Sequence, residues 1–110
     1  MKLPDLPFTV TDWEAVPAVE HPGEKGSAFW RTFTIGPLRI RLIEYTPGYV
    51  ADHWCERGHV LYVLTGELET ELRDGRTFKL TPGMSYTVSD AGDAAHKSST
   101  VTGAKLFVVD

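Results

Sequence analysis

Hydrophobic and polar positions alternate in short segments from residue 29 onward, and turn residues separate these segments. The pattern predicts many short β-strands, over residues 29–35, 38–45, 60–64, 67–72, 76–80, 85–88, 96–101 and 105–109. Asp74-Gly75 is typical of a two-residue hairpin turn between two of them. The run from Val60 to Leu64 is apolar at every position, which favours a strand covered on both sides. Because no ten-residue stretch shows a helical period, the pattern predicts an all-β sandwich or barrel.

Residues 1–28 differ from the rest of the chain because prolines and glycines interrupt them, at Pro4, Pro7, Pro17, Pro22, Gly23 and Gly26. This composition predicts an irregular arm with at most short strands. Phe8, Trp13 and Val16 give the arm apolar side chains to bury. We therefore expect two parts: an arm over residues 1–28, packed on the domain or on a partner subunit, and one β-domain over residues 29–110.

Composition and charge narrow the function classes. With 110 residues, 42% hydrophobic and 24% charged, the chain is an ordinary globular protein of one domain. A formal net charge of −4 without a basic stripe argues against nucleic acid as a partner. No apolar run approaches the roughly 20 residues of a membrane span, and the first residues lack the apolar core of a signal peptide. Cys55 is the single cysteine, which excludes an internal disulfide and predicts a cytoplasmic protein.

Four side chains of metal-binding type form the most informative group in the sequence: His53, Cys55, His59 and His96. Three of them lie within seven residues. In an extended strand, residues i and i+2 face the same side, so His53 and Cys55 are expected to point together while Trp54 points away. A short bend at Gly58 would then bring His59 back beside them.

The order of these residues resembles the first motif of the cupin superfamily, in which a glycine precedes His-x-His, a glutamate and a second glycine. The corresponding positions here are Gly48, His53, Cys55, His59 and Gly66. Cys55 replaces the second histidine of the motif, His59 replaces its glutamate, and the first gap is one residue shorter. A looser second motif, with a longer loop than is common, is formed by Leu80-Thr-Pro-Gly83, Gly92 and His96. The resemblance covers about residues 38–110.

The resemblance implies a cupin-type jelly-roll β-barrel, also called a double-stranded β-helix, with metal ligands on inward faces near one mouth. Carried over by position, the ligands are His53, Cys55, His59 and His96. More narrowly, Asp52-His53-Trp54-Cys55 is similar to the signature of a small group of bacterial cupins named DHCW after these four residues. The alternative is a metal-free barrel in which Cys55 is a buried small hydrophobic residue.

The identity of the metal depends on Cys55. If its thiolate is a ligand, three histidines and one cysteine favour Zn(II) in a closed tetrahedral site. If Cys55 stays off the metal, three histidines leave open positions suited to Fe(II) and oxygen chemistry, with Ni, Mn and Cu as further alternatives.

Two classes of function follow from such a site. The first, which we favour slightly, is a metal-dependent enzyme, an oxygenase or isomerase, that acts on a small molecule in the barrel cavity. The second is a non-catalytic cupin that senses or stores a metal or small ligand around a structural zinc ion. We also expect a homodimer, because small cupins commonly pair and the arm offers apolar residues for exchange.

Three further features of the sequence each have two interpretations. Asp52 either orients a neighbouring histidine or is a surface carboxylate. Three tyrosines either donate hydrogen bonds into the cavity or, as we favour, pack in the core: Tyr45, Tyr62 and Tyr86. An acidic row at Glu67, Glu69 and Glu71 either faces solvent, as we favour, or pairs across strands with Arg39, Arg41 or Arg76.

Overall fold

The computed structural model describes residues 2–110 and confirms the all-β prediction. Its elements in chain order are the 3-10 helix η1 (Trp13–Ala15) and the strands β1 (Val19–Pro22), β2 (Ser27–Ile35), β3 (Leu38–Tyr45), β4 (His59–Gly66), β5 (Leu68–Leu72), β6 (Thr77–Leu80), β7 (Ser85–Val88), β8 (His96–Ser99) and β9 (Ala104–Val109). No helix in this described part of the chain has the length and apolar character needed to cross a membrane.

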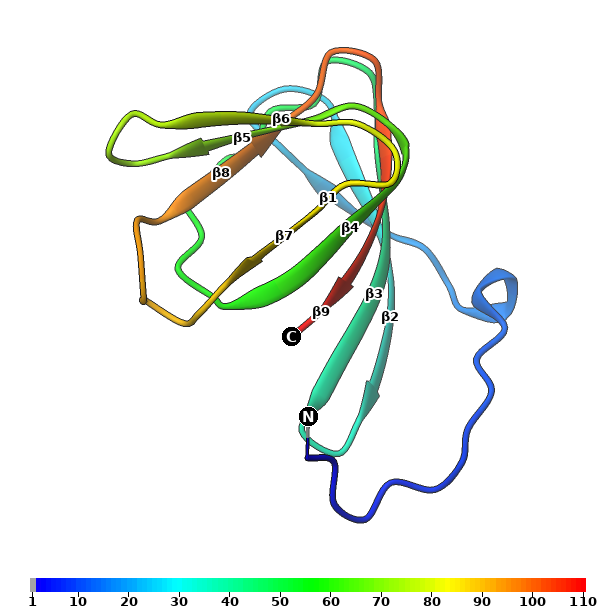
Figure 1. The fold of residues 1–110 in the computed structure, drawn as a ribbon. Coiled ribbons are helices and arrows are strands. Elements are labelled where there is room, and N and C mark those ends of the chain that lie inside the picture. Colours follow the sequence, from blue (N-terminus) through cyan, green and yellow to red (C-terminus); the bar gives the residue numbers. More distant parts are fainter. Residues whose placement is uncertain (1) are drawn as a thin grey trace.

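The strands form two sheets that lie over each other as the layers of a jelly-roll barrel (Figure 1). The larger sheet has the order β1-β2-β3-β9-β4-β7, and the smaller has the order β6-β5-β8. All pairs are antiparallel. The last strand in sequence, β9, lies between β3 and β4, so it joins the first half of the barrel to the second.

Apolar side chains fill the space between the two sheets. The larger sheet contributes Ile43, Leu61, Val63, Leu106 and Val108, and the smaller contributes Leu68 and Leu80. Buried and more exposed positions alternate along β9, as the two-residue period of a strand requires. The core therefore follows from the alternation in the sequence.

The prediction that β4 is covered on both sides is wrong. Leu61 and Val63 are buried in the core, but Val60, Tyr62 and Leu64 on the other face remain 46%, 42% and 41% exposed. A continuous apolar run is expected where both faces of a strand are covered. Here only the inner face meets the second sheet, so β4 carries an apolar outer face.

The arm runs outside the larger sheet and returns to it through η1 and β1 (Figure 1). The Nη1 atom of Arg31 on β2 donates to the carbonyl oxygens of Trp13 (2.8 Å) and Val16 (2.6 Å). The Trp13 ring meets Phe107 of β9 edge-on, with centroids 6.2 Å apart. Phe8, expected to be buried, is exposed, and Met1 of the predicted arm lies outside the described residues.

Candidate metal centre

Cys55 is held by a backbone pairing with His96. The amide of Cys55 donates to the carbonyl of His96 (2.7 Å), and the amide of His96 donates back to the carbonyl of Cys55 (2.9 Å). This isolated antiparallel bridge joins the loop before β4 to the first residue of β8. Residues directly opposite in such a pair project to the same side. The pairing thus brings together a cysteine and a histidine that lie far apart in the sequence.

His59 reaches the same place as the first residue of β4. Gly58 before it passes so close to the loop after β7 that a Cβ atom there would lie 2.5 Å from the amide nitrogen of Asp90. The Gly58 amide also donates to the Asp90 carboxylate at 2.6 Å. A glycine is therefore required at this crossing, which fixes the direction in which His59 enters β4.

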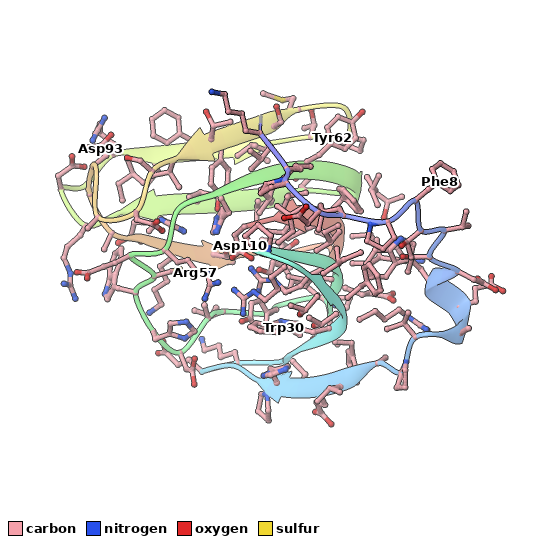
Figure 2. The ribbon with its side chains drawn as sticks, turned by 90° about the horizontal axis from the view of Figure 1, so that it is seen from below. Phe8, Trp30, Arg57, Tyr62, Asp93 and Asp110 are labelled. Atoms are coloured by element: carbon pink, nitrogen blue, oxygen red, sulfur yellow. The ribbon has the colours of Figure 1, made fainter. Side chains whose placement is uncertain are left out.

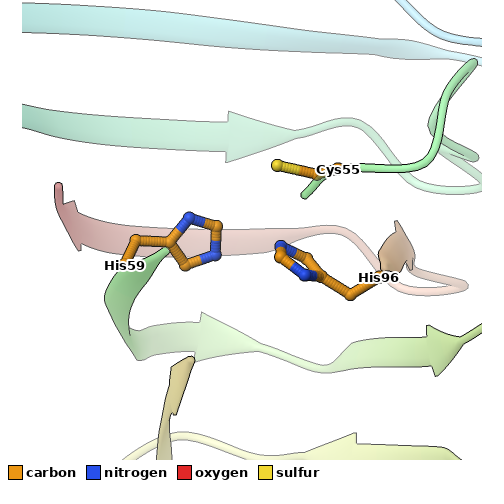
Figure 3. Close-up of side chains that lie close together, drawn as sticks. All are labelled: Cys55, His59 and His96. Atoms are coloured by element: carbon orange, nitrogen blue, oxygen red, sulfur yellow. The ribbon is translucent and has the colours of Figure 1, made fainter. Parts of the chain in front are cut away.

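Cys55, His59 and His96 form a compact group in which one potential ligand atom of each lies within 4.8 Å of the others. Figure 3 shows the three side chains pointing toward one another from three separate segments. Two buried nitrogens in the group, Nδ1 of His59 and Nε2 of His96, have no hydrogen-bond partner among the described residues. Because buried polar atoms are normally satisfied, these free lone pairs fit a bound metal ion. One sulfur and two imidazole nitrogens are a donor set that suits Zn(II).

The surroundings keep both histidines neutral, as metal ligation requires. Burial, together with the nearby His96 and Arg41, lowers the pKa of His59 from its usual 6.5 to about 4. Burial also lowers the pKa of His96. The Nε2 atom of His59 lies 2.8 Å from the hydroxyl of Tyr86, whose pKa burial raises well above the usual 10. Tyr86 therefore stays protonated, and since Nε2 of His59 contacts its hydroxyl, Nδ1 is the nitrogen of His59 without a hydrogen-bond partner among the described residues.

His53 does not join this group. Its side chain is 66% exposed, and its Nδ1 lies 2.7 Å from the carboxylate of the equally accessible Asp52. The segment that carries it is a loop with one bridge at Cys55 rather than a continuous strand. The expected i, i+2 geometry holds only in part, because His53 and Cys55 both line the cavity described next while the Trp54 ring lies beneath Arg73 and Lys97.

A cavity of about 270 Å³ adjoins the group. His53 lies on its wall together with Cys55, His59 and His96, and so do Tyr45 and Tyr86. Tyr62, by contrast, is exposed on the outer face of β4. The two inner tyrosines thus have access to a molecule in this space.

Three arginines that the sequence did not reveal as site residues also line the cavity: Arg39 and Arg41 of β3, and Arg57 of the loop before β4. Arg39 and Arg41 donate to the carboxylate of Asp110 at 2.8 to 3.2 Å. Arg57 forms an ion pair with the same carboxylate, with its Nε 3.1 Å from Oδ2. The alternative that we did not favour, in which Arg39 or Arg41 pairs with the acidic row, is therefore wrong. The signal was present in β3, where Arg39, Arg41, Ile43 and Tyr45 share one face, but Ile40 and Leu42 made the other face look like the interior.

The Asp110 carboxylate is almost wholly buried, with a side chain 1% exposed. Burial by itself raises its pKa, but the hydrogen bonds from Arg39 and the charges of Arg41 and Arg57 outweigh this and hold the pKa below the usual 3.8. Asp110 is thus ionised at neutral pH and is the counter-charge of the arginines.

Neither protein-family models nor curated proteins give a match to this sequence. Solved structures do match. The polyketide cyclase RemF from Streptomyces resistomycificus aligns with a TM-score of 0.74 and 25% identity over 93% of this chain and 78% of that chain. An RmlC-like cupin from Shewanella frigidimarina aligns at 0.70 and 22% identity over 94% and 90% of the two chains. The ectoine synthase of P. lautus aligns at 0.74 and 18% identity over 93% and 76%.

Proposed function

Because this chain has the cupin fold, we propose that it binds a divalent transition metal through Cys55, His59 and His96 and acts on a small molecule in the adjoining cavity. The convergence of these three donor atoms within 4.8 Å is the observation that carries the proposal. The thiolate favours zinc over iron, nickel or manganese, because a mixed sulfur and nitrogen set suits Zn(II).

The number of protein ligands favours an enzyme over a structural site. Structural zinc is usually held by four protein ligands, whereas catalytic zinc is held by three and keeps one position for water or substrate. The sequence alone predicted four ligands, with His53 as the fourth. With His53 directed to solvent and to Asp52, we infer a set of three that leaves a position open to the cavity.

A bound metal would supply Lewis-acid chemistry, polarising an oxygen of the substrate. The residues around it have roles of their own. In the tautomer that frees Nδ1 of His59, Nε2 carries the proton and donates to the Tyr86 oxygen at 2.8 Å. The Tyr86 hydroxyl can then donate its own proton toward a molecule in the cavity, which its wall position allows. Tyr86 would thus orient both the ligand histidine and the substrate.

These features support an isomerase-like or cyclase-like reaction on a small molecule. Among the structural neighbours are a polyketide cyclase and a sugar phosphate isomerase of the cupin superfamily, both matched at a TM-score above 0.7. Oxygenase chemistry is the alternative if the metal is iron, because zinc has no redox chemistry.

Elemental analysis of untagged protein purified without chelators tests the metal site. We expect about one zinc ion per chain in the unmodified protein, and loss of that zinc in both Cys55→Ser and His96→Ala. His53→Ala is the matched control, since it removes a histidine from the same cavity wall but not from the group of three.

The other outcomes separate the alternatives. Loss of zinc in His53→Ala as well would restore the four-ligand site and favour a structural or sensing role. Iron, nickel or manganese retained in Cys55→Ser would show that histidines alone hold the metal. Absence of metal from every variant, including protein grown with added zinc, would remove the central proposal.

We further propose a homodimer in which a second copy covers exposed apolar residues. Val60, Tyr62 and Leu64 form an apolar face on β4, and Phe8 and Val10 in the arm are 97% and 81% exposed. An exposed apolar face such as that of β4 commonly marks an interface. Light scattering at micromolar concentration should give twice the chain mass, and Tyr62→Glu should reduce it to the monomer. A monomer mass for the unmodified protein would contradict the proposal.

A further inference from the structure

The three arginines of the cavity wall surround a single carboxylate. Arg39 contacts Asp110 through Nε and Nη2, whereas Arg41 and Arg57 each use one nitrogen, at 3.2 and 3.1 Å. Figure 2 labels Arg57 and Asp110, which lie beside each other. The guanidinium of Arg41 lies 4.5 Å from the centre of the Trp30 ring. The cluster thus has a fixed position on the wall of the cavity.

Its side-chain charges are not balanced. Among the side chains, three guanidinium groups surround one carboxylate, and no aspartate or glutamate is among the described residues that line the cavity. Arg41 is only 6% exposed, and its Nε has no hydrogen-bond partner among the described residues. A buried guanidinium with an unused donor is unfavourable unless an acceptor satisfies it. The Trp30 ring stabilises the charge from its face but accepts no bond from an in-plane nitrogen.

The need to attach β9 through Asp110 does not explain why three arginines are present. One arginine with two parallel bonds already pairs the Asp110 carboxylate, as Arg39 does. Arg57 lies in a loop outside the strands, is 54% exposed at its side chain and still lines the cavity. Two arginines beyond the one that Asp110 needs therefore face the space next to the proposed metal site.

We propose that the arginine cluster, defined as Arg39, Arg41 and Arg57, binds the carboxylate or phosphate group of a small organic anion, and that such an anion is the substrate. This inference rests on the proposed function, because the same cavity would place the other end of the molecule at Cys55, His59 and His96. Guanidinium groups bind planar carboxylates and phosphates through paired charged hydrogen bonds. A cavity of about 270 Å³ limits the ligand to a small molecule.

Metal-free protein, titrated by calorimetry, tests this without any contribution from a metal. Succinate probes the carboxylate, propyl phosphate probes the phosphate, and succinamide is the neutral counterpart of succinate. We expect at least one of the two anions to bind about 10-fold or more tightly than succinamide, since a hydrogen bond to a charged group contributes about that factor. If succinate binds more tightly than propyl phosphate, the site prefers a carboxylate; the reverse order shows that it prefers a phosphate.

Two variants locate the binding. Arg57→Gln and Arg39→Gln should each weaken the anion about 10-fold, whereas Arg73→Gln removes an exposed positive charge outside the cavity and should leave it unchanged. Arg57→Gln decides the question if Arg39→Gln fails to fold, because Arg57 is a half-exposed loop residue.

The failures of the two proposals are distinguishable. Equal binding of both anions and succinamide, or unchanged anion binding in Arg57→Gln, would overturn the anion site even if the protein holds stoichiometric zinc. Preferential anion binding that needs Arg57, in a protein that never binds a metal, would support the anion site while removing the metal-dependent function.

Discussion

The two sides of the cavity differ in charge and in how the fold assembles them. One side is formed by Cys55, His59 and His96. Its two histidines each have a nitrogen without a hydrogen-bond partner and carry no charge at neutral pH. On the other side, the arginine cluster offers donors and a surplus of positive side-chain charge around Asp110. A ligand that satisfies both sides must carry an anionic group at one end and an oxygen or similar donor at the other. The polarity of the cavity thus defines the orientation of its ligand.

Removal of the Asp110 carboxylate should have the largest effect on the arginine side of the cavity. Asp110→Asn leaves three arginines without their carboxylate, and its side chain is 1% exposed, so we expect the free energy of unfolding to fall by about 3 kcal/mol. Urea denaturation measures this. Asp74→Asn is the control, since Asp74 pairs with Arg76 at the surface, where solvent screens the pair, and should change the free energy of unfolding much less. Equal effects of the two substitutions would show that the cluster is not dependent on Asp110.

A smaller effect is expected on the metal side from Tyr86→Phe. The substitution removes the hydroxyl that lies 2.8 Å from Nε2 of His59 and leaves the ring. Loss of such an outer partner typically weakens metal binding about 10-fold or more. Competition with a chromophoric zinc chelator measures the affinity, and Tyr62→Phe on the outer face of β4 should leave it unchanged. If Tyr62→Phe weakened zinc as much, the hydrogen bond to His59 would not be the cause.

The smallest effect concerns how the stability of the folded protein depends on pH, because the two sides of the cavity contribute in different pH ranges. In the unfolded chain His59 takes up a proton near pH 6.5, but in the folded protein only at about 4. The unfolded state therefore binds more protons in this window, and the metal-free protein loses stability as pH falls from 6.5 toward 4. The lowered pKa of Asp110 places its contribution in a lower window, lost only as pH falls below 3.8.

Thermal denaturation between pH 7.5 and 3 measures both windows. His59→Gln should reduce the decline of Tm above pH 4 by about 5 °C or more, and should leave the decline below 3.8 in place. An unchanged decline above pH 4 would show that His59 is protonated at its ordinary pKa in the folded protein.

Much of the barrel was predictable because each strand alternates with a period of two and ends at a turn residue. The metal side was partly predictable for a similar reason, since Cys55 and His59 lie four residues apart and His96 fits a second motif. The position of His53 was not predictable from the sequence, because it depends on whether the segment before Cys55 is a strand or a loop. The structure makes it a loop with one bridge, so His53 lines the same cavity as Cys55 but does not reach the group of three.

The arginine side could not be predicted, because both faces of β3 look acceptable as an interior. Arg41, Ile43 and Tyr45 alternate with Ile40, Leu42 and Glu44, and hydrophobicity does not decide between them. The choice depends on Asp110, which is 69 residues away from Arg41 in sequence. The same limit applies to β4, because no local pattern shows whether a second layer covers its outer face.

The central place of β9 has a consequence for the order of folding. The hairpin of β2 and β3 has local contacts and can close early, but β9 must insert between β3 and β4 after the rest of the chain is available. Until it does, Arg39 and Arg41 have no counter-ion, because Asp110 directly follows β9. We therefore expect the cavity to be completed in the last kinetic step.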